Sequence, residues 1–488
     1  MNRYDSLDQL YIAGEWRAAS TGDTAPTTDP FTDATLLDVA QASEDDLDAA
    51  YESAKAAQVE WAEAPPQTRQ AVIAKAAELM EQRRDEIVDW LVKESGSTAT
   101  KAGLELDNAI GITTEAASFP LRMEGSLFPS TIPGKENRVY RVPVGVVGVI
   151  SPWNFPFHLS MRSVAPALGA GNAVVLKPAS NTPVTGGTLL AALFEEAGLP
   201  GGVLNVTPGS GSEIGDAFVS HPVPRVISFT GSTPVGRHIA ELAGKHLKKV
   251  ELELGGNNIL VVLEDADLDQ AARAAAFGKF LHQGQICIAL NRIAVHASVA
   301  EAFTERFLDV VRSLQSGDPS DGATLVGPII DDDQLESVLD MIERTKEAGA
   351  TVALGGGHEG RVVEPTVFTG VTQDMPAAAE EIFGPVAPIL TFESDDEAVE
   401  IANATDYGLS GAVFTGDPER GVRLARRVVT GMIHVNDMSV NDEPHVAFGG
   451  RGASGIGRFG GQWVLDAFTT TQWVSVQHTP REYPLHGA

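Results

Sequence analysis

The sequence predicts an α/β protein with two parallel-sheet domains and a small separate β element. The first observation is a regular alternation of short apolar runs with helical stretches, which begins at Gly145-Val-Val-Gly-Val-Ile-Ser. The second is a further alternation of the same kind between Asn258 and about Gly450. Strands that alternate with helices form parallel sheets covered on both faces, and their buried strands are continuously apolar. Two such series therefore predict two α/β domains.

The N-terminal part predicts surface hairpins followed by a block of helices. Tyr11-Ile-Ala-Gly-Glu-Trp is typical of a strand and turn, and residues 20–35 are polar and rich in Pro and Thr. Ser43 and Asp46 have the spacing of a capping box, which starts a helix. Pro66 favours the first turn of a second helix. We interpret this helical block as structural.

Two alternating segments predict the separate β element. Arg138-Val-Tyr-Arg-Val-Pro-Val alternates polar and apolar residues, as a strand with two different faces does. Gln472-Trp-Val-Ser-Val-Gln-His near the C-terminus alternates in the same way. We expect the two segments to pair, at a sheet edge or an oligomer contact.

The two alternating series assign the remaining elements. The first series predicts strands at 147–150, 173–177, 203–206, 226–229 and 249–254, and helices at 184–196, 211–219 and 234–242. The second predicts strands at 259–263, 291–296 and 386–392, and helices at 268–282 and 299–314. Ligands of such sheets bind beyond the carboxyl ends of the strands. Residues that follow strands are therefore the first candidates for a functional site.

Composition limits the classes of function. The 488 residues are 43% hydrophobic and 21% charged, which is ordinary for a globular protein. No run approaches the ~18 apolar residues of a membrane helix, and the N-terminus lacks a signal-peptide pattern, so we expect a cytoplasmic protein. The 66 acidic and 35 basic residues give a net charge of −31, which opposes binding to nucleic acid or an anionic membrane. The acidic residues are dispersed, which suggests a halophilic source and a protein that loses stability as salt is removed.

Polar residues follow three strands of the first series. Asn154 lies between two prolines, where a fixed amide can donate to a developing oxyanion. Lys177 ends the next strand and suits a phosphate or ribose, unless it is a plain surface lysine. Gly231, Ser232 and Gly236 surround a helix start that is typical of a phosphate site.

Two further residues could carry chemistry themselves. Glu253 ends a strand just before a Gly-Gly bend and is either a general base or part of a salt bridge. Cys287 is the only cysteine, and it is either a nucleophile or a small buried hydrophobe. His282 lies five residues earlier, so a Cys-His hydrolase is an alternative, although no hydrolase signature accompanies it. The 11 histidines form no metal-binding cluster with the cysteine.

One literal dinucleotide motif is rejected. Residues 450–455 read Gly-Arg-Gly-Ala-Ser-Gly, which matches G-x-G-x-x-G. No clear strand precedes this stretch and no clear helix follows it. Both are needed to place a pyrophosphate on a helix N-terminus, so we do not expect a cofactor here.

Seven motifs in the family's order resemble the aldehyde dehydrogenase superfamily over nearly the whole chain. They are Pro152-Trp-Asn-Phe-Pro, Lys177-Pro-Ala-Ser, Phe229-Thr-Gly-Ser-Thr-Pro-Val-Gly, Leu252-Glu-Leu-Gly-Gly, Gly284-Gln-Ile-Cys, Glu381-Ile-Phe-Gly-Pro-Val and Phe448-Gly-Gly. The resemblance implies oxidation of an aldehyde to the carboxylic acid with NAD(P). Cys287 would attack the aldehyde, Asn154 and the Cys287 backbone amide would hold the oxyanion, and Glu253 would activate the water that hydrolyses the thioester.

The resemblance also implies a set of cofactor-binding residues. Glu381 and Phe383 would position the nicotinamide ribose, and Lys177 would bind the adenine ribose. The complete expected set is Trp153, Lys177, Ser180, Gly231, Ser232, Gly236, Glu381 and Phe383. Many NAD-preferring members have a glutamate where this chain has Ser180. Serine neither repels nor crowds a 2′-phosphate, so we expect NADP to be tolerated or preferred.

The resemblance is nearest to members that act on benzaldehyde- or vanillin-like aldehydes. Apolar Ile286 and Ile288 beside the cysteine suit an uncharged substrate, whereas a carboxylate-bearing semialdehyde would need an arginine in the pocket. A CoA-acylating relative and a non-catalytic structural relative are further alternatives. Glu253 speaks against the former, and the intact motifs speak against the latter.

Domain organisation follows from the same resemblance. Residues 1–120 and 144–254 would form an NAD(P)-binding domain, and residues 255–450 a catalytic domain, each with a Rossmann-like sheet. Residues 121–143 and 468–488 would form oligomerisation strands of a homodimer or homotetramer.

Overall fold

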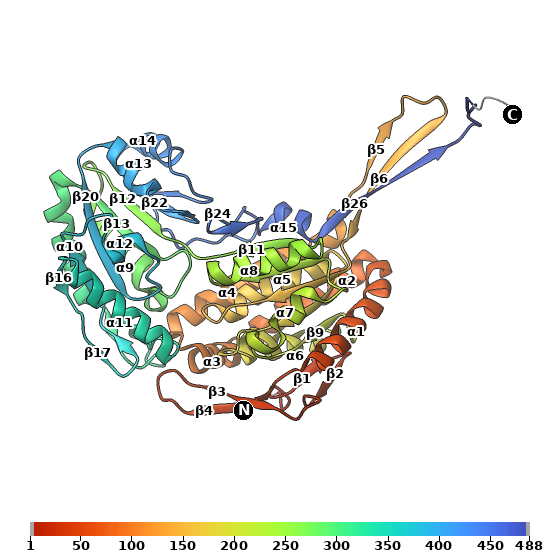
Figure 1. The fold of residues 1–488 in the computed structure, drawn as a ribbon, viewed down its shortest axis with the longest axis horizontal. Helices are drawn as coiled ribbons and strands as arrows, with labels where there is room; N and C mark the ends of the chain where they lie inside the picture. Colours follow the sequence, from red (N-terminus) through yellow and green to blue (C-terminus); the bar gives the residue numbers. More distant parts are fainter. Residues whose placement is uncertain (1–3, 485–488) are drawn as a thin grey trace.

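The computed structural model of the protein describes residues 4–484 and consists of two lobes and a projecting arm. Figure 1 shows one sheet in each lobe, with helices against the sheets, and the arm extending away from the lobe that holds the N-terminus. The predicted α/β fold with two largely parallel sheets is confirmed.

The first lobe is built on an eight-stranded sheet. Its spatial order is β2-β1-β9-β8-β7-β10-β11-β25. The five central strands, from β9 to β11, are parallel, and the chain order reverses at β7, which lies between β8 and β10. The strands are β1 (Leu10–Ile12), β2 (Glu15–Arg17), β7 (Val146–Ile150), β8 (Ala173–Lys177), β9 (Leu204–Val206), β10 (Val226–Thr230), β11 (Lys249–Glu253) and β25 (Gly455–Ile456). Such a reversal point is where ligands bind in parallel sheets.

Helices of this lobe follow the predicted pattern. They are α1 (Glu44–Glu63), α2 (Pro66–Gln82), α3 (Arg84–Ser95), α4 (Ala99–Ala116), α5 (Pro156–Gly169), α6 (Leu189–Glu196), α7 (Gly211–Ser220), α8 (Thr233–Lys245) and α15 (Gly461–Ala467). The predicted capping box of α1 is confirmed, because Asp46 N–H donates to Ser43 Oγ and Ser43 N–H donates to Asp46 Oδ2. The helix predicted from residue 184 starts with a wide π turn, where buried Glu94 accepts from the N–H groups of Val184 and Thr185.

The second lobe is built on a seven-stranded sheet of order β16-β19-β20-β13-β12-β22-β23. Its strands are β12 (Asn258–Val262), β13 (Leu290–His296), β16 (Thr351–Leu354), β19 (Thr366–Thr369), β20 (Val386–Phe392), β22 (Gly411–Phe414) and β23 (His434–Val435). Its helices are α9 (Leu268–Phe280), α10 (Ala300–Arg312), α11 (Asp332–Glu347), α12 (Pro376–Ala379), α13 (Asp395–Asn403) and α14 (Pro418–Ala425). All strands except β16 run parallel.

The helix predicted over residues 268–282 ends two residues early, at Phe280. His282 and Gln283 have φ values of 49° and 57°, which a right-handed helix cannot accommodate. Gln283 Nε2 donates to the Pro328 carbonyl oxygen at 2.7 Å and stabilises this left-handed turn. The turn carries the chain from α9 toward Cys287, so tertiary contacts override the local helical pattern.

The arm consists of β5 (Ser126–Pro129), β6 (Lys135–Pro143) and β26 (Thr469–Gln477). The predicted pairing of the two alternating segments is confirmed, since β26 is antiparallel to β6 with Trp473 opposite Val139. The large side chains of Leu127, Phe128 and Trp473 are exposed. Of the predicted range 468–488, the last four residues lie outside the described part.

Short strands complete the fold. They are β3 (Thr24–Thr28), β4 (Thr35–Ala40), β14 (Gln315–Ser316), β15 (Thr324–Val326), β17 (His358–Glu359), β18 (Val362–Val363), β21 (Tyr407–Gly408) and β24 (Arg451–Gly452). The antiparallel pair of β3 and β4 confirms the predicted surface hairpin. Among residues 4–484, no helix has the length and apolarity needed to cross a membrane.

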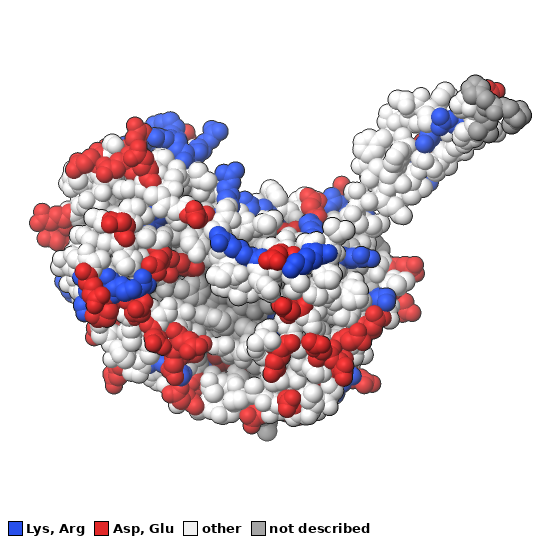
Figure 2. All heavy atoms as spheres, viewed as in Figure 1, with Lys and Arg blue, Asp and Glu red and all other residues white. Residues whose placement is uncertain are grey.

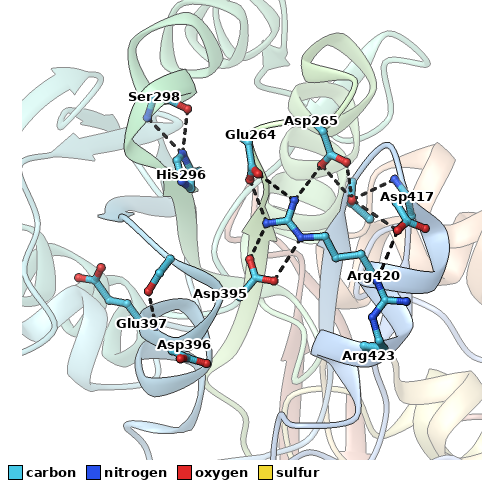
Figure 3. A network of polar contacts seen from close by, with 12 residues as sticks. Glu264, Asp265, His296, Ser298, Asp395, Asp396, Glu397, Asp417, Arg420 and Arg423 are labelled. Carbon is cyan, nitrogen blue, oxygen red and sulfur yellow. Dashed lines mark hydrogen bonds and ion pairs between the residues drawn. The ribbon is translucent and has the colours of Figure 1, made fainter.

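Acidic side chains are scattered over both lobes, as Figure 2 shows, rather than gathered in one patch. Near the carboxyl end of β12, one arginine forms ion pairs with several of these acidic side chains (Figure 3). Arg420 of α14 pairs with Glu264 at 2.9 Å and with Asp395 at 2.6 Å, and Asp265 lies 3.8 Å away. These residues tie α13 and α14 to the end of β12, and we call them the Arg420 network.

Candidate active site

Asn154 lies in the turn between β7 and α5, at the point where the strand order of the first sheet reverses. It is buried, and its side-chain Nδ2 donates to the backbone oxygen of Gln285 at 2.8 Å. Gln285 precedes Cys287 by two residues. The amide of Asn154 is therefore directed at the segment that carries the sulfur.

Two charged residues of α4 form hydrogen bonds that fix this turn. Lys101 Nζ donates to the backbone oxygen of Asn154 at 2.7 Å and forms an ion pair with Glu105. Glu105 Oε1 accepts from the N–H groups of Phe157 and His158 at 2.9 and 3.2 Å, so a carboxylate caps the N-terminus of α5. Both charged side chains are fully buried. The helical block that we interpreted as structural thus reaches the site, and a Lys-Glu pair four residues apart on a buried face was the signal in the sequence.

Glu253 is the last residue of β11, and its side chain is buried with 1% exposure. Neither carboxylate oxygen has a hydrogen-bond partner among the described residues. Burial raises the pKa of Glu253 to about 8, although the charge of Arg162 opposes this. Glu251, on the same face of the strand, instead pairs with Lys249 at 3.1 Å. The structure therefore separates the two carboxylates into one unpaired and one paired group.

Cys287 lies between the 3-10 turn of Leu281–Gly284 and β13. Asn258 Nδ2 fixes the backbone here by donating to the carbonyl oxygens of Cys287 and Ala289 at 2.8 and 2.7 Å. Ser439 Oγ donates to the next carbonyl oxygen, that of Ile288, at 2.6 Å. Burial and the negative charge of Glu253 raise the pKa of the Cys287 thiol well above its usual range. The thiol therefore needs a nearby proton acceptor before it can act as a nucleophile.

A cleft of about 300 Å³ joins the three residues, because Asn154, Glu253 and Cys287 all line it. That volume is at the lower end of the range for small-molecule sites. Five of the predicted cofactor residues also line it, namely Trp153, Gly231, Ser232, Glu381 and Phe383. The sequence carried no signal for Gln334 and Ser337 of α11, which form part of the wall.

Glu381 is the main carboxylate of the cleft wall in the second lobe. Its Oε1 accepts from the N–H of Gly256 at 2.9 Å, and a side chain at Gly255 would collide with it. Burial raises the pKa of Glu381 to about 7. Phe383 has φ of 50° and packs edge-on against Trp153, with 5.5 Å between ring centroids. A polar acceptor beside two aromatic rings suits a ribose and a flat heterocycle.

The expectation that site residues follow strands is wrong for the second lobe. Cys287 comes three residues before β13, and Glu381 comes before β20 rather than after a strand. Both therefore lie at the amino ends of the strands of the second sheet. Asn154 and Glu253 lie at the carboxyl ends of the first sheet, as expected.

Three predicted cofactor residues lie away from the cleft wall. Lys177 is buried and its pKa is lowered by burial to about 8. Its Nζ donates to the Pro178 carbonyl oxygen at 3.3 Å, and no carboxylate of residues 4–484 contributes to its pKa. Ser180 is exposed, and Gly236 packs so closely on Leu254 that a side chain would collide. Lys177 is thus a buried cation free to meet a hydroxyl or an anion.

Other candidate chemistries find no support in the geometry. His282 packs edge-on against Phe155, with ring centroids 5.7 Å apart, and burial lowers its pKa well below the usual range. Within the described residues, neither ring nitrogen of His282 has a hydrogen-bond partner, and no group of three or more His, Cys, Asp or Glu side chains could hold a metal. The rejected glycine motif forms β24 and β25, which pair with other strands, so it is no strand-to-helix turn.

The arrangement combines the parts needed for covalent chemistry at a carbonyl carbon. Cys287 offers a sulfur nucleophile, and Asn154 offers an amide donor near the position where an oxyanion would form. Glu253 offers an unpaired carboxylate whose pKa of about 8 suits a general base near neutral pH.

Comparison with known proteins gives one consistent result. The model of the aldehyde dehydrogenase family matches residues 16–474. A vanillin dehydrogenase of Corynebacterium glutamicum is 55% identical over 96% of this chain and 97% of the relative, and a benzaldehyde dehydrogenase of Bacillus subtilis is 51% identical over 99% and 100%. The crystal structure of an NAD-dependent benzaldehyde dehydrogenase from Corynebacterium glutamicum superposes with a TM-score of 0.90 at 51% identity, covering 98% of this chain and 100% of that chain.

Proposed function

The chain belongs to the aldehyde dehydrogenase family, and we propose that it oxidises an aromatic aldehyde to its carboxylic acid with NAD(P) through a covalent Cys287 intermediate. The observation that carries the mechanism is that Cys287, Glu253 and Asn154 line one cleft. The aromatic substrate class rests on the names of the relatives, a vanillin and a benzaldehyde dehydrogenase. Apolar Ile286 and Ile288, both buried beside the sulfur, are compatible with that class.

The chain's own residues would act in two stages. In the first, the Cys287 sulfur attacks the aldehyde carbon, its proton passes to a base, and Asn154 Nδ2 and the Cys287 N–H donate to the oxyanion. In the second, Cys287 holds the acyl group as a thioester, and Glu253 takes a proton from the water that attacks it. The proton then leaves Glu253 as the acid is released, and the thiol is restored.

The cofactor would occupy the wall formed by Trp153, Gly231, Ser232, Glu381 and Phe383. Bound NAD(P)+ supplies the hydride acceptor for the oxidation. Lys177 would donate to the adenine ribose, in agreement with its burial and its lack of an ion-pair partner among the described residues. In this assignment residues 1–120 and 144–254 form the cofactor-binding domain, and residues 255–450 form the catalytic domain.

Cofactor selectivity is proposed from Ser180. This exposed serine carries no charge that would repel a 2′-phosphate, so we infer that both NAD and NADP are used. The Corynebacterium glutamicum benzaldehyde dehydrogenase is NAD-dependent, which favours NAD as one of the two. The ratio of kcat/KM for NAD and NADP tests this, and a strong rejection of NADP would remove the inferred role of Ser180.

We infer the assembly from the exposed side chains of the arm, and the location from the sequence. The arm of β5, β6 and β26 presents Leu127, Phe128 and Trp473 to solvent, which supports its assignment as an oligomerisation element of a dimer or tetramer. Light scattering would measure the subunit number. A cytoplasmic location, expected from the sequence, remains a prediction.

The activity test follows absorbance of the reduced nicotinamide with benzaldehyde or vanillin and either cofactor, with and without CoA. We expect NAD(P)-dependent oxidation that CoA does not accelerate, and a loss of at least ~10³-fold in kcat/KM in Cys287→Ser. Activity that survives this substitution would contradict the nucleophile assignment. Activity that requires CoA would contradict the role of Glu253 and favour a CoA-acylating enzyme.

A further inference from the structure

We propose that His158, Arg162 and Asp442 form a recognition site for a ring hydroxyl of the aldehyde substrate. The site would lie on the side of Cys287 and Glu253 away from the cofactor cleft. This inference rests on the proposed function, because it names the substituent that distinguishes one aromatic aldehyde from another.

Arg162 is the first observation. Its side chain is buried in α5 with 2% exposure, and the guanidinium lies between the rings of Phe448 and Phe459, at 4.4 and 4.6 Å from their centroids. None of its three side-chain nitrogens has a hydrogen-bond partner among the described residues. The nearest carboxylate oxygen, Oδ2 of Asp442, is 3.6 Å away, which is too long for a hydrogen bond. Buried arginine donors are almost always satisfied, so this group is suited to a ligand.

Asp442 and His158 supply the complementary half. His158 Nε2 and Asp442 Oδ2 are 3.0 Å apart, and His158 Nδ1 has no partner among residues 4–484. Burial favours the neutral form of Asp442, but the hydrogen bond with His158 and the charge of Arg162 outweigh it and lower the pKa. An ionised Asp442 is an acceptor, whereas Arg162 is only a donor.

The position of this cluster places it next to the reacting atoms. His158 and Arg162 lie four residues apart on α5, the helix that begins just after Asn154. Asp442 lies three residues after Ser439, whose hydroxyl donates to the carbonyl oxygen of Ile288 beside Cys287. The charge of Arg162 affects both Glu253 and Cys287, yet none of the three cluster residues lines the cofactor cleft. The cluster therefore lies near Glu253 and Cys287 but outside the cofactor cleft.

The mixture of charges selects the kind of substituent. A substrate carboxylate would pair with Arg162 but would also meet the like charge of Asp442, whose Oδ2 is 3.6 Å from Nη1. A hydroxyl accepts from Arg162 and donates to Asp442 at the same time, so both groups are satisfied. Phe155, Phe448 and Phe459 surround the polar groups with rings that suit an aromatic substrate. The cluster thus favours a phenolic aldehyde over an unsubstituted or carboxylated one.

The test compares aldehydes that differ only in the ring substituent. We measure kcat/KM with saturating NAD for benzaldehyde, 3- and 4-hydroxybenzaldehyde and 4-carboxybenzaldehyde, and define selectivity as the larger hydroxybenzaldehyde value divided by the benzaldehyde value. In the wild type we expect a selectivity of at least ~10 and little use of 4-carboxybenzaldehyde. In Asp442→Asn and Arg162→Met we expect it to fall ~10-fold or more. Dividing by the benzaldehyde value removes any effect of either substitution on the chemical step.

The matched control is Glu251→Gln, which removes a different buried carboxylate of the first lobe, one that already pairs with Lys249. Its selectivity should equal that of the wild type. Asp442→Asn keeps the shape of the side chain, so it decides the question if Arg162→Met does not fold. Selectivity unchanged in Asp442→Asn, or a wild-type preference for benzaldehyde or 4-carboxybenzaldehyde, would overturn the proposal. Absence of oxidation with all four aldehydes would instead contradict the proposed function itself.

Discussion

The two sheets contribute to the site from opposite ends. Asn154 and Glu253 lie at the carboxyl ends of β7 and β11 in the first sheet, whereas Cys287 and Glu381 precede β13 and β20 in the second. The carboxyl end of β12 in the second sheet is occupied by the Arg420 network instead (Figure 3). The cleft therefore lies between the carboxyl edge of one sheet and the amino edge of the other. A parallel sheet can therefore border a site with the amino ends of its strands, while another sheet contributes the carboxyl ends of its strands.

This difference suggests a division of labour that can be tested. In the proposed mechanism, the second lobe supplies the sulfur, and the first supplies the amide and the base. If the division holds, a change to the base at the first sheet should stop hydrolysis but leave formation of the thioester intact.

The largest effect is expected in Glu253→Gln. Without the carboxylate, water is not activated, so steady-state turnover should fall ~10²–10⁴-fold. A first burst of reduced cofactor, equal to the enzyme concentration, should remain, because Cys287 acts before hydrolysis. Rapid-mixing absorbance measures both quantities. Loss of burst and turnover together would mean that Glu253 mainly activates the thiol, and the two sheets would not act separately.

The pH profile sharpens the same result. The pKa of Glu253 is raised to about 8, and a general base works only when ionised. Wild-type turnover should therefore rise tenfold per pH unit up to about 8 and then level off. The residual turnover of Glu253→Gln should lack this inflection. An unchanged inflection in the variant would assign it to another group, such as Cys287.

The sequence predicted the site residues of the first sheet better than those of the second, for a physical reason. The apolar strands and their alternation with helices are local patterns, and they located Asn154 and Glu253 as residues that follow strands. Cys287 was a candidate because it is the only cysteine, and Glu381 was found through motif resemblance alone, since no strand rule points to amino ends. The end of α9 at Phe280 was missed because the left-handed turn at His282 is fixed by distant Pro328.

The pair Lys101 and Glu105 illustrates what tertiary structure alone supplies. Both residues lie on α4, more than 40 positions before Asn154 in the chain. Only the packing of α4 against α5 brings them to the turn that holds the amide. The three polar residues proposed to recognise a ring hydroxyl share this property, since α5 and the segment at Asp442 meet only in the fold.

A further prediction concerns the Lys101–Glu105 pair, which holds the Asn154 turn in the first lobe. Lys101→Met leaves Glu105 buried without its partner and should cost about 3–5 kcal/mol in unfolding free energy. The double variant Lys101→Met/Glu105→Gln should recover part of this stability, but neither variant can hold the Asn154 carbonyl. We expect kcat to fall ~10–100-fold in both, with KM for the cofactor unchanged. Urea denaturation and steady-state kinetics measure the two effects.

The control for that prediction is an exposed pair with the same spacing. Asp89 and Lys93 of α3 are 2.7 Å apart and about half exposed. The double variant Asp89→Asn/Lys93→Met should change neither stability nor kcat appreciably. Full activity in the Lys101 double variant, after stability is regained, would show that the buried pair has no positioning role.

The smallest effect is expected at the carboxyl end of the second sheet, where the comparison assigns no chemistry. Arg420→Gln leaves Glu264, Asp265 and Asp395 facing one another, so unfolding free energy should fall by about 1 kcal/mol at low salt. The loss should shrink in about 1 M KCl, where screening acts within ~3 Å, and kcat should not change. Arg423→Gln, which removes a more exposed partner of Asp417 at 3.4 Å, is the control and should have a smaller effect. Urea midpoints in the two salts also test the wider expectation that a chain of net charge −31 loses stability as salt is removed. A fall in kcat in Arg420→Gln would contradict the division between the two sheets, because the network would then act on a site at the opposite end of its strands.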